Sequence, residues 1–215
     1  MSPRAGTVGS RRRPSKGDVT SQAILDTAAR LLRTRALDDV AVDELAAGAG
    51  ISRSTFYFHF ASREAVLHAL SGAVVDALYE SASAWLRRGD EPPEVAVRRA
   101  LGAGLAVWRK HGAVLRAAAR ARDTDPMMRE FWSGVARRFV EATASRIELE
   151  RAAGVAPGGP DARSLAAVLV SMNEQTFLNR SRSRRSTARD RELVDTLTCV
   201  WLRSVYGLPG DKGPQ

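Results

Sequence analysis

Residues 42–60 read VDELAAGAGISRSTFYFHF, and this stretch decides the fold of the N-terminal part of the chain. Apolar residues recur at spacings of three and four on either side of Gly50, which indicates two short helices joined by a tight turn. Ser52 stands where a helix N-cap belongs. The pattern therefore predicts a helix-turn-helix, with helices at about 42–49 and 52–58.

The second of these helices is predicted to carry a nucleic-acid contact surface. Its outward positions hold hydrogen-bonding side chains near a helix N-terminus, where a recognition helix meets base edges and phosphates. Phe56 and Phe60 are expected to belong to the core instead. We expect DNA contacts from Ser52, Arg53, Ser54, Thr55, Tyr57 and His59.

The same stretch resembles the TetR family of bacterial transcriptional regulators. Ala41 departs from the family pattern, which usually has a Thr or Ser N-cap there, and Arg63 replaces a lysine. Arg63 keeps the positive charge, so the resemblance places it near a DNA phosphate. The matching residues stand in one register and are Leu45-Ala46, Gly50-Ile51-Ser52, Phe56-Tyr57, His59-Phe60 and Ser62-Arg63-Glu64.

The resemblance implies an all-α, TetR-like fold of about nine helices. It divides the chain into a helix-turn-helix domain of three helices at 18–68 and a ligand-binding and dimerisation domain at 69–208. Residues 1–17 are expected to form a disordered basic arm, and residues 209–215 a flexible tail. From apolar spacing, helices are expected at about 20–34, 42–49, 52–58, 62–85, 94–110, 112–122 and 126–147. Two more helices follow, and the second of them ends at Gly207.

The net charge of +9 lies mostly outside the predicted reading helix. Residues 1–17 carry +5 and residues 180–191 carry +5, which leaves −1 for the remainder. Arg11, Arg12 and Arg13 are expected to reach DNA phosphates or a minor groove and to add salt-dependent affinity. For residues 180–191, RSRSRRSTARDR, three interpretations stay open: a flexible loop, a second nucleic-acid contact, or solvated chain.

The predicted C-terminal domain carries tryptophans and other large apolar residues on its helix faces. Such side chains suit an apolar ligand cavity, and an amide such as Asn173 would orient the ligand by hydrogen bonds. The expected lining of this cavity is Trp85, Leu101, Leu105, Trp108, Trp132, Phe139, Thr143, Met172, Asn173, Phe177 and Trp201.

Both ends of the chain resemble one mycobacterial branch of the family, whose regulator represses a monooxygenase gene. Gly104, Val97 and Val170 depart from that branch at pocket positions, so the cavity and its ligand are expected to differ. The residues that match pocket positions of that branch are Trp132, Phe139, Thr143, Asn173 and Trp201.

The expected function is a ligand-responsive repressor that binds a palindromic, double-stranded DNA operator as a homodimer. A small hydrophobic ligand is expected to release it. A ligand-independent DNA-binding or architectural protein, or a transcriptional activator, are the alternatives left open. Catalysis is not expected, because none of the three histidines lies in a known catalytic motif.

No cofactor or metal is expected, and a single cysteine, Cys199, excludes a zinc site built from a cysteine cluster. No apolar run is long enough to cross a membrane, and residues 1–17 lack the apolar core of a secretory signal. A cytoplasmic protein with no membrane partner is therefore expected.

Overall fold

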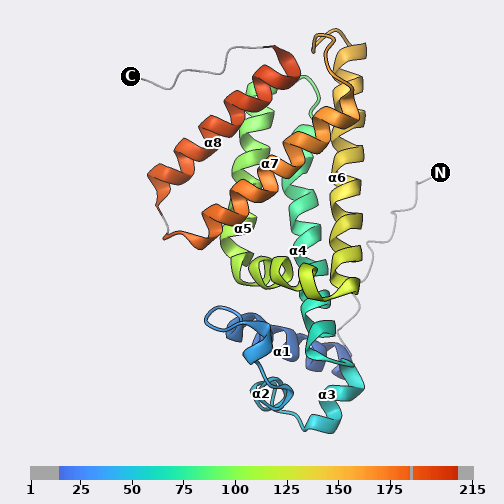
Figure 1. Cartoon of the computed structure of the whole chain (residues 1–215), viewed down its shortest axis with the longest axis vertical. Coiled ribbons are helices and arrows are strands. Elements are labelled where there is room, and N and C mark those ends of the chain that lie inside the picture. The colour runs from blue at the N-terminus through green and yellow to red at the C-terminus, as the bar shows by residue number, and fades with distance from the viewer. Residues whose placement is uncertain (1–14, 185, 208–215) are drawn as a thin grey trace, which may run out of the picture. The chain divides into compact units, whose positions relative to one another are not determined.

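The computed structural model describes residues 15–184 and 186–207, and within these residues every regular element is helical (Figure 1). The all-α prediction is confirmed for this part of the chain, with eight α-helices in place of about nine. A 3-10 turn at Leu37–Asp39 and a π-helical segment at Leu202–Tyr206 complete it. The helices are α1 (Lys16–Leu31), α2 (Val42–Gly48), α3 (Arg53–His59), α4 (Arg63–Leu86), α5 (Pro93–Thr124), α6 (Pro126–Ala152), α7 (Ala162–Arg182) and α8 (Thr187–Trp201).

Helix α1 begins at Lys16 rather than at about residue 20. The cause is a capping box at Ser15, whose hydroxyl accepts from the Asp18 N–H at 3.2 Å while the Asp18 carboxylate accepts from the Ser15 N–H at 2.8 Å. Lys16 and Gly17 thus belong to a helix and not to a disordered arm. Residues 1–14, with Arg11, Arg12 and Arg13, lie outside the described residues, as does the tail at 208–215.

The difference in helix count lies in α5, which runs from Pro93 to Thr124 where two helices were expected. The expected break is a kink, since His111 has φ −106° and ψ 15°, outside the helical range. A Cβ atom on Gly112 would lie 3.3 Å from the Cβ atom of Ser181, so the missing side chain lets α7 approach α5 closely. The glycine therefore marks a kink and a close approach rather than a helix end.

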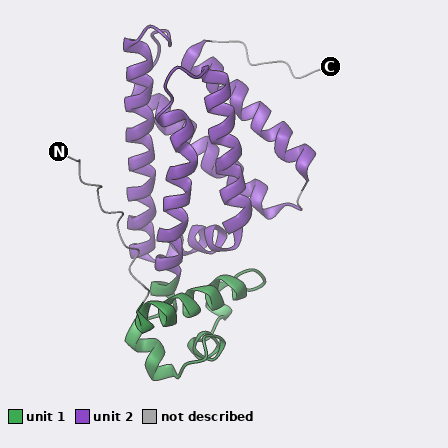
Figure 2. Cartoon of the chain, turned by 180° about the vertical axis from the view of Figure 1, so that it is seen from behind, with its two compact units in different colours: residues 1–66 green, residues 67–215 purple. Residues whose placement is uncertain are grey.

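The chain divides into two compact units, residues 1–66 and 67–215 (Figure 2). Helix α4 begins in the first unit and runs through most of its length in the second. In the first unit α1 packs against α2 and α3. Its core is built around Ile24, Leu45 and Phe56, which have no exposed surface.

Close packing of α1 on α2 depends on Gly48, the last residue of α2. A Cβ atom at this position would lie 2.4 Å from Cγ2 of Thr27, and Thr27 is buried in α1. A separation this short is sterically forbidden. Any larger residue at position 48 would push the two helices apart.

In the second unit α6 packs along α7, and α5 contacts α6, α7 and α8 (Figure 1). The turn after α8 ends at Gly207, which has φ 65°, a left-handed conformation that favours glycine. This agrees with the predicted helix end. Asp125 caps α6 by accepting from the Met127 N–H at 2.9 Å, with Pro126 in the first turn.

A buried ionic cluster joins α4 and α6 in this unit. Glu150, whose side chain is 1% exposed, accepts from Nε of Arg88 at 2.8 Å and also bonds Arg146. Burial alone would raise the pKa of Glu150, but the hydrogen bonds from Arg88 and Arg146 outweigh it and hold the pKa below its usual value. The carboxylate therefore stays ionised in the folded chain.

We expect Gly48→Ala to lower the free energy of unfolding of the first unit by about 1–3 kcal/mol, because the added methyl group must displace Thr27. Gly72→Ala in α4 is the matched control, since a Cβ atom there meets nothing within 4 Å. Alanine is the better helix former, so the control should gain stability. Urea denaturation of the full chain checks both, and equal stability of the two variants would contradict the packing argument.

We expect Glu150→Gln to cost about 3–5 kcal/mol at pH 7, because two arginines lose their buried carboxylate. A lowered pKa means that the stabilisation is present above the unfolded-state value of about 4.3 and is lost as the pH falls below it. The difference between wild type and variant should therefore shrink in acid. Denaturation curves across this pH range check it, and a pH-independent difference would refute the assignment.

Candidate DNA-reading surface and ligand cavity

The turn between α2 and α3 is held by its backbone. Gly50 has φ 68°, and the Ile51 N–H donates to the carbonyl of Ala46 at 3.0 Å. The Ser52 hydroxyl then accepts from the Thr55 N–H at 3.1 Å and caps α3. Local residues therefore set where α3 starts, as the sequence predicted.

Arg53 and Tyr57 form a joined pair on the exposed side of α3. Arg53 donates to the carboxylate of Asp43 at 2.8 Å and to the Tyr57 hydroxyl at 3.4 Å. The hydrogen bond to Asp43, followed by that to Tyr57, raises the pKa of Arg53. The guanidinium group stays charged next to the tyrosine, a combination suited to a phosphate group.

Not every residue predicted for DNA contact faces outward. Ser52, Arg53, Ser54 and Tyr57 are exposed, but Thr55 and His59 are half-buried. His59 turns towards α1, where its Nδ1 lies 3.0 Å from the hydroxyl of Ser21. The hydroxyl of Thr55 lies 2.9 Å from that of Ser52 at the start of the helix.

Arg63 is engaged within its own unit. Its guanidinium group donates to the backbone carbonyl of Asp38 at 2.8 Å and to the carboxylate of Glu64 at 2.9 Å. The hydrogen bond to Glu64 raises the pKa of Arg63. The side chain ties the start of α4 to the turn before α2, and a phosphate contact would have to replace one of these bonds.

Phe58 is the residue of α3 that the sequence reasoning missed. It is 87% exposed, the largest exposure among the large hydrophobic residues described, and Tyr57 beside it is 46% exposed. Phe58 lies two positions after Phe56, about 200° around the helix, so it points away from the core. Once Phe56 was assigned to the core, the helical period was enough to predict that Phe58 is exposed.

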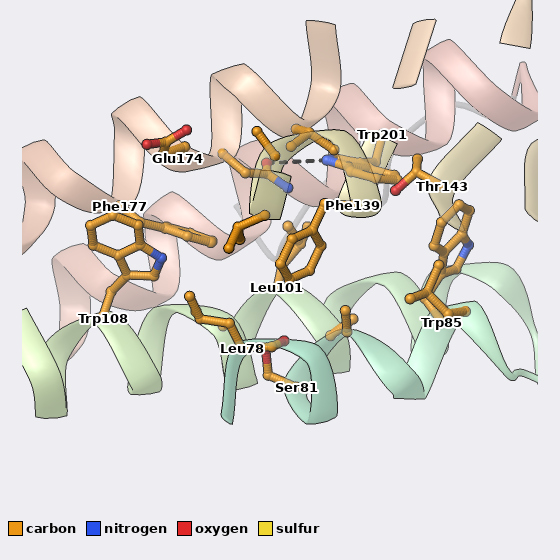
Figure 3. Close-up of a pocket in the computed structure, with 18 of the residues that line it drawn as sticks. Leu78, Ser81, Trp85, Leu101, Trp108, Phe139, Thr143, Glu174, Phe177 and Trp201 are labelled. Atoms are coloured by element: carbon orange, nitrogen blue, oxygen red, sulfur yellow. Dashed lines mark hydrogen bonds between the residues drawn. The ribbon is translucent and has the colours of Figure 1, made fainter. Parts of the chain in front are cut away.

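The second unit contains an apolar cavity of about 140 Å³ formed by α4, α5, α6, α7 and α8 (Figure 3). Towards one end of the view lie Trp108 and Phe177, and towards the other lie Trp85 and Thr143 (Figure 3). Nine of the predicted residues line it: Trp85, Leu101, Trp108, Trp132, Phe139, Thr143, Asn173, Phe177 and Trp201.

Two predicted residues do not line this cavity. Leu105 is buried and borders a separate groove between α5 and α8, and Met172 is half-buried elsewhere on α7. Each is one position from a lining residue, so the helical turn carries it to another face. Three more lining residues, Val97, Gly104 and Val170, stand at the pocket positions where the chain departs from the mycobacterial branch. The residues that sequence reasoning missed are mostly small or aliphatic: Leu78, Ser81, Ala82, Leu86, Ala100, Val135, Ala136 and Glu174.

Gly104 shapes the cavity by lacking a side chain. A Cβ atom there would lie 3.3 Å from Cε2 of Phe177, so the ring from α7 takes the space beside the glycine. Val97 and Val170, the other two departures from the mycobacterial branch, also line the wall. All three positions therefore contribute to the shape of the cavity.

Few polar groups border the cavity. Asn173 accepts from the indole N–H of Trp201 at 3.2 Å, and Glu174 pairs with Arg122 at 2.6 Å (Figure 3). The indole N–H of Trp132 is buried without a hydrogen-bond partner among the described residues. An unpaired buried donor costs free energy, which an acceptor on a bound molecule would recover.

Two family models match the chain, one for each unit. "Bacterial regulatory proteins, tetR family" matches residues 24–70, and "Transcriptional regulator EthR, C-terminal domain" matches residues 97–207. The chain belongs to the TetR family of transcriptional regulators. Its second unit is therefore an EthR-type C-terminal domain.

Curated relatives agree with this TetR-family assignment. The HTH-type transcriptional regulator EthR of Mycolicibacterium smegmatis is 40% identical over 199 residues, covering 91% of this chain and 89% of the relative. EthR of Mycobacterium tuberculosis is 38% identical over 196 residues, covering 91% and 90%. These relatives are named as transcriptional regulators, not as enzymes.

Solved TetR-family structures share the fold at lower identity. The regulator PfmR from Thermus thermophilus matches with a TM-score of 0.68 at 22% identity, over 84% of this chain and 97% of that one. A TetR-like regulator from a Rhodococcus species matches with a TM-score of 0.65 at 20% identity, over 88% and 97%. At such identities the likeness concerns the fold alone.

The described part of this TetR-family chain contains neither a helix that could span a membrane nor a cluster of metal ligands. None of its helices is long and apolar enough to cross a membrane. Across residues 15–184 and 186–207, no three His, Cys, Asp or Glu side chains gather as a metal site would require.

We expect Phe58→Ala to weaken binding to operator DNA about tenfold, the scale of one lost base contact, while leaving thermal stability unchanged. The reason is that Phe58 is 87% exposed and contributes little to the core. Val19→Ala is the matched control, since Val19 is a 59% exposed apolar residue of the same unit on α1. Fluorescence anisotropy checks the prediction, and equal affinities for the two variants would contradict it.

Proposed function

We propose that the chain is a repressor that binds a palindromic operator as a homodimer through α3 and is released by a small hydrophobic ligand. The observation that carries this proposal is the apolar cavity in the EthR-type unit, walled partly by α4. Helix α4 also begins in the unit that contains α3. One helix therefore belongs to both the ligand cavity and the DNA-binding unit.

The proposed ligand is mainly apolar and carries one hydrogen-bond acceptor. The volume of about 140 Å³ is close to that of an apolar cavity of about 150 Å³ that binds benzene. A longer molecule must displace lining side chains such as Phe177. The unpaired N–H of Trp132 supports an acceptor such as a carbonyl group.

The proposed release mechanism is a shift between two states of the dimer. Leu78, Ser81 and Trp85 of α4 line the cavity, and Arg63 at its start bonds the carbonyl of Asp38 in the first unit. A ligand that binds better when α4 has moved would favour a spacing of the α3 helices that no longer fits the operator. Such coupling typically amounts to about 1–3 kcal/mol.

The homodimer is proposed to form through α7 and α8. Val168 of α7 is 65% exposed and Val200 of α8 is 36% exposed, which supports an apolar contact surface on these two helices. A two-fold dimer matches a palindromic operator. No catalytic role is proposed. The resemblance to the mycobacterial branch supports a monooxygenase gene as the target of regulation.

The first experiment measures binding of the full chain to the DNA immediately upstream of its own gene. Acetophenone is the probe, because it joins a benzene ring to one carbonyl acceptor, and ethylbenzene is the control without the acceptor. We expect acetophenone to weaken DNA binding about tenfold and ethylbenzene several-fold less, the scale of one hydrogen bond. Retained DNA binding with no response to either compound would favour a ligand-independent or architectural protein.

The matched variant is Trp132→Phe, which keeps an aromatic ring and removes the indole N–H. We expect it to respond equally to acetophenone and ethylbenzene, since it has no donor left for the carbonyl. An acetophenone preference that survives this substitution would contradict the assigned hydrogen bond. A reporter gene under the upstream DNA separates repression from activation by the sign of its change on deleting the regulator.

A further inference from the structure

The described parts of the arginine-rich segment, residues 180–184 and 186–191, lie against the middle of α5, beside the kink at His111 (Figure 1). Basic side chains from three helices gather there. The end of α7 and the start of α8 both contact α5 at this point. The contributing residues are Arg109, Lys110, Arg116 and Arg120 of α5, Arg180, Arg182 and Arg184 at the end of α7, and Arg189 and Arg191 of α8.

Two arginines are structural and share one carboxylate. Asp190 accepts from Nη2 of Arg109 and from Nε of Arg180, both at 2.6 Å. These arginine side chains are only 11% and 10% exposed. Burial alone would raise the pKa of Asp190, but hydrogen bonding and charge from the two arginines keep it low. The charge of Asp190 is therefore already paired with these two arginines.

Further arginine contacts hold the backbone of the connection in place. Arg109 donates to the carbonyl of Ser183 at 2.9 Å, and Arg116 donates to that of Ser181 at 3.1 Å. Arg180 donates to the carbonyl of Ser186 at 3.2 Å. The described part of this segment is thus anchored at several points and presents its remaining side chains from a defined surface.

Four arginines on this surface are exposed and form no ion pair among the described residues: Arg182, Arg184, Arg189 and Arg191. We call them the outer arginines. Asp190 is the one acid within residues 180–191, and it is already doubly paired. Burial, followed by the charges of Arg120 and Arg182, lowers the pKa of nearby Arg116. Repulsion between such unpaired positive charges lowers the stability of the folded chain, and a bound anion would relieve it.

We propose that the outer arginines form a second DNA contact, which binds the phosphate backbone of duplex DNA and is separate from α3. The basic charge on this surface comes almost wholly from arginine. Its planar guanidinium group can donate two parallel hydrogen bonds to the oxygens of one phosphate. The TetR-family assignment makes duplex DNA the polyanion that this protein meets. Backbone contacts of this type add affinity without reading sequence.

The test uses the full chain and a random-sequence duplex, with affinity measured by fluorescence anisotropy over a series of salt concentrations. The variant replaces all four outer arginines by glutamine. The control removes the same charge from four exposed arginines elsewhere in the second unit that likewise form no ion pair among the described residues: Arg129, Arg137, Arg138 and Arg203. Both variants therefore have equal net charge, and only the position of the charge differs.

We expect the variant to bind the random duplex at least tenfold more weakly at low salt than the control variant. Its slope of log affinity against log salt should be shallower by about 0.9 for each lost phosphate contact. Equal affinities and equal slopes for the two variants would overturn the proposal. A double variant, Arg184→Gln with Arg189→Gln, repeats the test if four changes unfold the chain.

Failure of this proposal is distinguishable from failure of the proposed repressor function. The outer arginines should affect random and upstream duplexes by the same factor, because phosphates carry no sequence. Phe58→Ala should instead reduce the preference for the upstream duplex. Sedimentation should show an unchanged oligomeric state. A variant that alters only sequence preference, with an unchanged salt slope, would also refute a backbone contact.

Discussion

The position of α4 depends on one buried carboxylate. Glu150 reaches from α6 to Arg88, just beyond the end of α4, and also bonds Arg146 on its own helix. Next to this cluster, the indole N–H of Trp85 donates to the hydroxyl of Tyr206 at 2.8 Å and ties α4 to the turn after α8. A buried ion pair adds little net stability, but breaking one is costly. These contacts tie the C-terminal end of α4 to α6 and to the turn after α8.

The helix-turn-helix could be predicted in detail because its determinants are local. The turn glycine, the Ser52 cap and the buried Phe56 all lie within a few residues of each other. Which side chains of α3 are exposed was harder to predict. The inward turn of His59 depends on Ser21, which is 38 residues away in α1, and no pattern within α3 reveals it.

The aromatic residues that line the cavity were predicted from the sequence, whereas most of its small lining residues were not. Tryptophans stand out in a sequence, whereas Gly104 contributes by leaving room for Phe177 from another helix. Leu105 has the composition of a lining residue but faces the groove between α5 and α8. The kink at His111 lies next to Gly112, whose missing side chain leaves room for Ser181 of α7. Each of these features arises where helices distant in sequence come together.

The central claim is that one equilibrium links the cavity of the second unit to DNA binding by the first. Thermodynamic linkage then requires reciprocity: DNA must weaken ligand binding by the factor by which ligand weakens DNA binding. The most direct measurement is the affinity of the full chain for acetophenone with and without saturating upstream duplex. The account predicts the same factor, about tenfold, in both directions. An acetophenone affinity that DNA leaves unchanged would contradict it.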